Sequence, residues 1–171
     1  MNTHIAFLRA VNVGGTGKLP MADLKAICTK LGFKNARTYI ASGNLAFESQ
    51  LTAEQARKAL EKQLEAYAGK PIGIIMRSIA DLKLIEDANP FPDAPGNKVL
   101  VLLLDRGVES ADTESVQHHT SEEIRTSKNE IYIHYPDGQG KSKLTLKQAQ
   151  ADGTARNMNT ILKVKQLAEK P

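Results

Sequence analysis

Residues 4–48 read HIAFLRAVNVGGTGKLPMADLKAICTKLGFKNARTYIASGNLAFE, and they decide the fold of the chain. The first of them, residues 4–11, alternate between two faces as a strand does, with Ile5 and Phe7 on the same face. A loop with three glycines follows at residues 12–18. The stretch therefore begins as a strand that ends in a glycine-rich connection.

A helix is expected directly after this loop. Pro20 suits the first helical position, and apolar residues such as Leu24 and Cys28 recur at helical spacing until Gly32, which supplies the C-terminal cap. Cys28 is therefore expected to face the core. Because it is the single cysteine, an intramolecular disulfide is excluded and a reducing compartment is favoured.

The rest of the N-terminal half completes a recognisable order of elements. Residues 36–41 and 45–48 are expected to form a hairpin about a turn at residues 42–44. Thr52 and Gln55 form a capping-box signal for a helix that runs to about residue 68, and a strand follows at residues 72–77. The resulting order, βαββαβ, is that of a ferredoxin-like unit.

The second half has a looser version of the same pattern. A linking helix ends near residue 88, and the proline-rich residues 89–97 are expected to be a linker between subdomains 1–88 and 98–171. The expected elements of the second subdomain are a strand at 98–104, a helix at 108–119, a hairpin of 122–126 with 130–135, and helices at 144–151 and 157–168. We therefore predict an α+β fold of two ferredoxin-like (βαββαβ-type) subdomains with antiparallel or mixed sheets.

Composition and charge restrict the class of protein. The 171 residues are 41% hydrophobic and 25% charged, which is typical of a globular chain. Arg9 interrupts the apolar run at the N-terminus, and residues 99–104 are too few to span a bilayer, so no membrane association and a cytoplasmic location are expected. The net charge of +4 is uneven, because residues 1–78 carry 11 basic and 5 acidic residues while residues 79–137 carry 5 and 12. This pattern fits a nucleic-acid binder, but it fits better a chain whose basic ends and acidic middle pack together.

Several motifs in the first half resemble those of the bacterial domain-of-unknown-function family 1697. Members of that family carry LLRGINVGG, IPMAEL and YIQSGNVVF segments. The counterparts here are LRAVNVGG at residues 8–15, LPMADL at residues 19–24 and YIASGNLAF at residues 39–47. The resemblance implies an α/β fold with two related subdomains, and it implies no established activity.

A second block of resemblance lies near the C-terminus. The family patterns YLHYPxGxGxSKLT and TxRNWNTVxKL correspond to residues 132–145 and 154–163. Met158 stands where the family has Trp, so an aromatic stacking platform is not expected there, although Met would serve as core filler. Both blocks contain a glycine-rich loop that follows an expected strand.

The candidate site combines the polar residues of these two blocks. We expect the two glycine-rich loops, which contain residues 15–18 and 138–142, to form a composite site between the subdomains for a phosphate- or carboxylate-bearing small molecule. Asn12 and Tyr135 stand where a Walker P-loop needs Gly, so this is not a nucleotide-binding P-loop. The candidate ligand-binding residues are Arg9, Asn12, Lys18, Asn44, Lys141, Ser142, Lys143, Arg156, Asn157 and Asn159.

Two alternatives stay open. The polar residues could form a structural network in a protein-interaction module, or the chain could bind nucleic acid, although Phe7 and Phe47 do not make the aromatic pattern of an RNA-recognition sheet. We predict no metal site and no cofactor, because His118 and His119 are adjacent and cannot form a metal pair one helical turn apart. The sequence assigns no catalytic residue and no oligomeric state.

Overall fold

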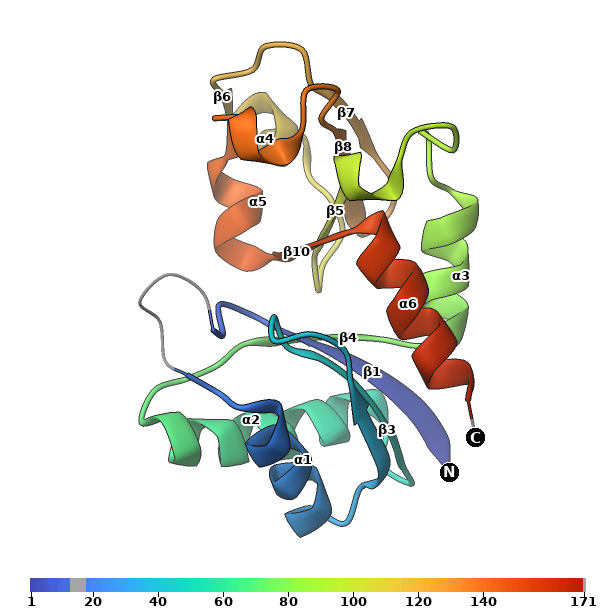
Figure 1. Ribbon diagram of the computed structural model, residues 1–171. Coiled ribbons are helices and arrows are strands. Elements are labelled where there is room, and N and C mark those ends of the chain that lie inside the picture. Colours follow the sequence, from blue (N-terminus) through green and yellow to red (C-terminus); the bar gives the residue numbers. More distant parts are fainter. Residues whose placement is uncertain (13–17, 171) are drawn as a thin grey trace. The chain divides into compact units, whose positions relative to one another are not determined.

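The computed structural model describes residues 1–12 and 18–170 (Figure 1). The interior of the first glycine-rich loop, residues 13–17, lies outside the described residues, and so does residue 171. The chain divides into two compact units. Unit 1 contains Met1–Lys83 and Lys163–Pro171, and unit 2 contains Leu84–Leu162. Among the described residues, no helix combines the length and the hydrophobicity that crossing a membrane requires.

Unit 1 contains a four-stranded antiparallel sheet in the order β2-β3-β1-β4. Its elements in chain order are β1 (Asn2–Leu8), α1 (Met21–Lys30), β2 (Lys34–Thr38), β3 (Asn44–Ser49), α2 (Ala53–Ala68) and β4 (Ile74–Arg77). The strand and helix order expected for residues 1–78 is therefore confirmed. The hairpin turn is longer than expected, since β2 ends at Thr38 and Ile40 has a positive φ of 50°.

Helix α2 of unit 1 has capping interactions at both of its ends. Thr52 accepts a hydrogen bond from the Gln55 amide (3.2 Å), and the Gln55 side chain accepts one from the Thr52 amide (3.0 Å). Gly69 ends α2 with φ of 74°. The predicted capping box is thus confirmed. Tyr67 donates to Asp23 (2.6 Å) and so joins α2 to α1.

The core of unit 1 lies between the sheet and these two helices (Figure 1). Leu8 and Phe47 from the sheet belong to the same buried cluster as Leu24, Cys28 and Leu60 from the helices. Burial raises the pKa of the Cys28 thiol to about 12, so the thiol is protonated and unreactive at neutral pH. The expectation that Cys28 is a core residue is confirmed.

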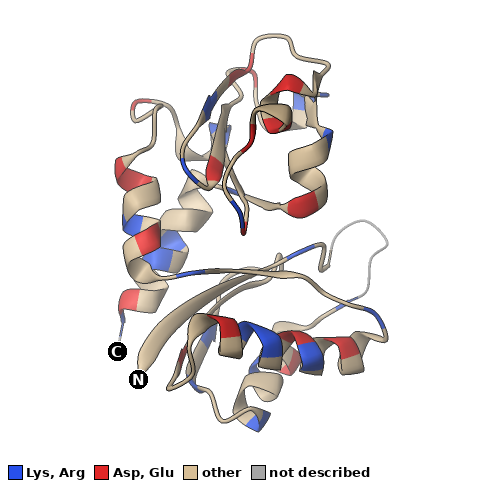
Figure 2. Ribbon diagram, turned by 180° about the vertical axis from the view of Figure 1, so that it is seen from behind, with Lys and Arg blue, Asp and Glu red and all other residues tan. Residues whose placement is uncertain are grey.

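Charged residues of both signs occur on each unit (Figure 2). On α2 they alternate along the exposed face, where Arg57 pairs with Glu54 and with Glu61. At the C-terminal end of unit 1, Arg37 donates to the main-chain oxygens of Leu167 and Lys170. This guanidinium satisfies carbonyl groups that the end of a helix leaves without partners.

Unit 2 contains a second antiparallel sheet, in the order β10-β5-β8-β7, and a two-stranded sheet of β6 and β9. The elements are α3 (Ile79–Asp87), which begins in unit 1, η1 (Gly96–Lys98), β5 (Val99–Leu103), α4 (Ser110–Glu114), β6 (Val116–Gln117), β7 (Glu123–Thr126), β8 (Glu130–His134), η2 (Gln139–Lys141), β9 (Thr145–Leu146), α5 (Lys147–Asp152), β10 (Thr154–Asn157) and α6 (Met158–Glu169), which ends in unit 1. The predicted hairpin of 122–126 with 130–135 is confirmed.

Three sequence predictions for unit 2 need correction. The helix expected at 108–119 is limited to α4, because the chain enters β6 at Val116. The helix expected at 144–151 begins only at Lys147. Residues Thr154–Asn157, for which no strand was expected, form the strand β10, because their backbone pairs with β5.

The sheet of unit 2 has two distinct faces. Leu100, Leu102 and Ile133 point to a core cluster that includes Leu144 and Leu146. The alternate residues of the same strands point the other way, as alternation along a strand requires. On that face the Tyr132 hydroxyl donates to the main-chain oxygen of Ile85 (2.8 Å).

Candidate functional site

A polar pocket of about 40 Å³ lies beside the second glycine-rich loop, within unit 2. This volume accommodates a few water-sized groups. It therefore suits the head of a small molecule and not a complete nucleotide. The residues that give the pocket its chemistry are Thr120, Glu122, Tyr135, Asp137, Lys141 and Ser142.

The loop that borders the pocket is built by two turns. After β8 the Gly138 amide donates to the Tyr135 oxygen (3.0 Å), and Gly138 takes a positive φ of 87° that glycine adopts without strain. The Ser142 amide then donates to the Gln139 oxygen (3.1 Å). Lys98 fixes the start of the loop by donating to the Pro136 oxygen (3.1 Å).

Glu122 is the centre of the hydrogen bonding in the pocket. Its carboxylate accepts from the Ser142 hydroxyl (2.6 Å) and from the Thr120 amide (2.8 Å), and its side chain and backbone together are only 5% exposed. The Ser142 hydrogen bond, followed by the backbone N–H groups of Thr120 and Glu122, lowers the pKa of Glu122 to about 2. The pocket therefore contains a carboxylate that is ionised at neutral pH.

The folding stability of the protein should depend on pH through the ionisation of Glu122. The folded-state pKa of about 2 lies below the ordinary value of 4.5, so ionised Glu122 stabilises the fold above pH 4.5 and loses that contribution as the pH falls from 4.5 towards 2. We expect the stability difference between the parent protein and Glu122→Gln, measured by urea unfolding, to shrink across this window. The exposed neighbour variant Glu123→Gln should show no such change. A difference that stays constant with pH would contradict the assignment.

Three further side chains give the pocket donors and acceptors. Tyr135 is 4% exposed, and its burial and the nearby charge of Glu122 raise its pKa to about 12. Asp137 is exposed and accepts from the Ser121 hydroxyl (2.9 Å). Within the described part of the chain, no ion pair involves the ammonium group of Lys141 or Lys143.

The predicted site residues of unit 1 have mainly local roles. The Asn12 side chain accepts from the Leu19 amide (2.7 Å) and donates to the oxygens of Leu19 (2.8 Å) and Ala41 (2.7 Å). Buried Asn44 donates to the Tyr39 oxygen (2.8 Å) inside the hairpin turn. Both amides therefore fix the loop conformations.

The two predicted basic residues of unit 1 lie beyond its first strand. Arg9 follows the end of β1, where its amide donates to the Gly73 oxygen (2.9 Å). A Cβ atom on Gly73 would lie 3.1 Å from Arg9 Cδ, so the Arg9 side chain runs across Gly73. Lys18 is exposed at the edge of the residues that are not described.

Arg156 differs most from its predicted position. It lies in β10 opposite Val101, which in turn lies opposite Tyr132, so its side chain leaves the sheet on the face away from Leu144. Its guanidinium donates to the Thr154 hydroxyl (2.7 Å), and burial lowers its pKa to about 10. Arg156 is therefore a strand residue, and its contribution to a ligand site with the 138–143 loop stays a prediction.

The remaining predicted residues are distributed around unit 2. Ser142 and Lys141 line the pocket, and Lys143 is exposed beside it in the sequence. Asn157 accepts from the Thr160 amide (2.9 Å) at the start of α6. Asn159 lies against Gly96, since a Cβ atom there would come within 2.0 Å of its Oδ1 atom.

Sequence reasoning missed the acidic half of the pocket, although one signal was present. In the predicted hairpin, Glu123 pairs with His134, so the preceding residue Glu122 is brought opposite the following residue Tyr135. An anion site is predicted from basic and amide side chains, and neither Glu122 nor Tyr135 is of these types. The same is true of Asp137, which lies in the same glycine-rich motif.

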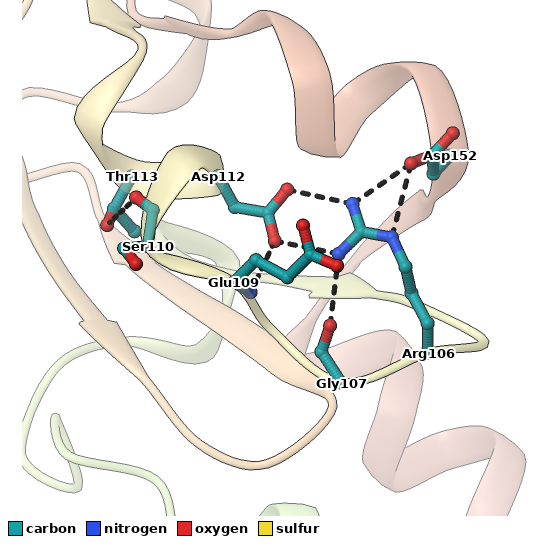
Figure 3. A network of polar contacts seen from close by, with 7 residues as sticks. All are labelled: Arg106, Gly107, Glu109, Ser110, Asp112, Thr113 and Asp152. Carbon is teal, nitrogen blue, oxygen red and sulfur yellow. Dashed lines mark hydrogen bonds and ion pairs between the residues drawn. The ribbon is translucent and has the colours of Figure 1, made fainter.

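A second polar network in unit 2 is structural (Figure 3). The Arg106 guanidinium donates to both carboxylate oxygens of Asp112, each at 2.8 Å, and to Asp152 (2.9 Å). The Glu109 amide also donates to Asp112 (2.7 Å). These groups satisfy one another and join α4 to the end of α5, so we do not assign a ligand to them.

Comparison with known proteins supports the fold and gives no activity. A search of curated proteins finds no match. The structure of a conserved bacterial protein, SP0830 from Streptococcus pneumoniae, is similar with a TM-score of 0.81 over 98% of each chain and 24% sequence identity. A family model described as a protein of unknown function, DUF1697, matches residues 1–132. The chain therefore belongs to the DUF1697 family of proteins of unknown function.

Proposed function

We propose that the protein binds a small molecule that carries a phosphate or carboxylate group, and that Lys141 and Lys143 receive this group at the pocket of unit 2. The observation that carries the proposal is the state of Lys141. It lines the pocket, and no described residue forms an ion pair with its ammonium group. Basic side chains near structural carboxylates commonly pair with them, so two lysines without such partners suit an external anion. Ligand contacts of Arg9 and Lys18 remain predictions.

The architecture supports a finer proposal. Residues 1–88 and 98–171 would each be a ferredoxin-like subdomain, joined by the linker 89–97. Support comes from the matching strand orders β4-β1-β3-β2 and β10-β5-β8-β7, in which corresponding elements occupy corresponding places. In both sheets the first strand is central, and the connection between the second and third strands is a hairpin.

The ligand proposal is tested by binding measurements with simple anions. Charge-assisted hydrogen bonds contribute about 1.5–3 kcal/mol, so Lys141→Met should weaken binding of a phosphate-bearing compound by roughly ten- to a hundredfold. The measurement is a titration with inorganic phosphate, acetate and a set of sugar phosphates, in which the amide chemical shifts of residues 135 and 137–143 are monitored.

Lys147→Met is the matched control. Lys147 is also an exposed lysine of unit 2, on α5, and it does not line the pocket. It should leave affinity unchanged. If Lys141→Met and Lys147→Met weaken binding equally, or if no anionic compound shifts the loop amides, the proposal is wrong.

A further inference from the structure

The pocket contains a buried carboxylate, Glu122, and no cation of the described residues lies within ion-pair distance of it. Within the described residues, the Glu122 carboxylate accepts hydrogen bonds from neutral donors, namely the Ser142 hydroxyl, the amide and hydroxyl of Thr120 and its own amide. Among residues 1–12 and 18–170, no lysine, arginine or histidine forms an ion pair with its carboxylate. Buried carboxylates are ordinarily paired with a cation, because an isolated charge is costly to remove from water.

The Tyr135 hydroxyl is a second and independent sign of a ligand. Tyr135 is more than nine-tenths buried and lines the pocket. No hydrogen bond to its hydroxyl occurs within the described residues, and this oxygen is not among the fully buried side-chain atoms, so it is open to the pocket. Buried tyrosines usually place the hydroxyl against a partner, so this oxygen has an unused acceptor site and an unused proton inside the pocket.

The charges of the lining residues indicate the charge of the ligand group that the pocket would bind. Glu122 and Asp137 carry two negative charges, whereas Lys141 is the single basic residue in the lining. The lysine is exposed and Glu122 is buried, so the negative charge lies deeper than the positive charge. A ligand with a cationic end and an anionic end would match this order.

We infer that the pocket binds a protonated amine, with Glu122 and Asp137 as counter-ions and the Tyr135 oxygen accepting one N–H. This inference deepens the proposed function and rests on it for the site, since the anionic group of the same ligand faces Lys141. The ligand class is a small zwitterion, such as an amino acid or an amino-alcohol phosphate. The pocket volume of about 40 Å³ admits an ammonium head with its first carbon and leaves the acidic end outside.

The test uses ligands that separate the two ends. Methylammonium carries only the amine, inorganic phosphate only the anion, and phosphoethanolamine both. Each is titrated into the protein while the amides of residues 120–122, 135 and 137–142 are observed by NMR. We expect methylammonium to shift these amides, and phosphoethanolamine to bind at least tenfold more tightly than either single-ended compound. Phosphate binding without methylammonium binding overturns the inference. Methylammonium binding without phosphate binding supports it and refutes the anionic half of the proposed function.

Variants identify the groups involved. Tyr135→Phe keeps the ring and removes the hydroxyl, and Glu122→Gln keeps the shape and removes the charge. We expect each to weaken methylammonium binding by tenfold or more while Glu123→Gln, on an exposed neighbour, leaves it unchanged. Glu122→Gln also removes hydrogen bonds that hold the loop in its conformation. The inference is therefore judged from methylammonium binding by the unmodified protein and by Tyr135→Phe. If calcium ions shift the pocket amides and methylammonium does not, the pocket is a metal site and the inference is wrong.

Discussion

Replacing Gly43 with Ala is expected to lower the free energy of unfolding by about 3 kcal/mol. Gly43 has a φ of +89°, a conformation that disfavours residues with a Cβ atom. An added Cβ would also lie 2.8 Å from both Leu8 Cβ and Val11 Cγ2. These two side chains are buried in the core of unit 1, so they cannot move away without disturbing their own packing.

The backbone at Gly43 cannot easily move to relieve the steric clash of an added Cβ atom. Gly43 accepts a hydrogen bond from the Leu8 amide (2.9 Å), which fixes the hairpin turn to the end of β1. A shift of the turn large enough to admit a methyl group would lengthen this bond. We therefore expect both strain and loss of packing to contribute.

Gly69→Ala provides the matched control. Gly69 also has a positive φ, +74°, but a Cβ atom there would meet nothing within 4 Å. Gly69→Ala should show the cost of the left-handed backbone conformation without a steric clash, about 1 kcal/mol. Urea unfolding followed by circular dichroism gives both values. Equal effects at the two positions would show that the contacts with Leu8 and Val11 are unimportant.

Much of unit 1 could be predicted because its signals are local. The capping box of Thr52 with Gln55 and the glycine cap at Gly69 lie within the element that they define. Apolar alternation in β1 likewise needs no information from elsewhere in the chain. Such signals fix the type of an element and give its ends to within a few residues.

Unit 2 was harder to predict because β10 depends on distant residues. In Thr154–Asn157 the buried positions, Thr154 and Arg156, are polar, so no apolar alternation marks the strand. What makes it a strand is pairing with Leu100–Leu103 of β5. The neighbouring sequence suggested a helix start, and the Asn157 cap of α6 does follow directly.

The candidate site was predicted in part for a related reason. Ser142 and Lys141 could be chosen from composition and the glycine-rich loop, and both line the pocket. Glu122 gains its importance from three-dimensional contacts, since its hydrogen bond with Ser142 joins segments that are far apart in the chain. An anion site is predicted from basic and amide side chains and not from carboxylates, whereas the described lining of the pocket contains Glu122 and Asp137 as well as Lys141.

The Asp112→Asn variant should be the most destabilising polar substitution in unit 2, at about 3 kcal/mol. The Asp112 side chain is fully buried, and both of its oxygens accept from Arg106 at 2.8 Å. An asparagine would place an NH₂ group against the guanidinium in place of one oxygen and remove the opposing charge. The hydrogen bond from the Arg106 guanidinium is also the main reason that the pKa of Asp112 is lowered, which shows that the charged form is the one this site favours.

Asp152 makes this prediction specific, because it binds the same guanidinium from an exposed position. Its side chain is 51% exposed and lies 2.9 Å from Arg106. Exposed ion pairs contribute less than about 1 kcal/mol, so Asp152→Asn should have a small effect. Urea unfolding of the two variants, each followed by circular dichroism, compares a buried and an exposed partner of one cation. If Asp152→Asn lowered the free energy of unfolding as much as Asp112→Asn, the burial of Asp112 would not explain the large effect. Both carboxylates would then contribute equally through their contact with Arg106.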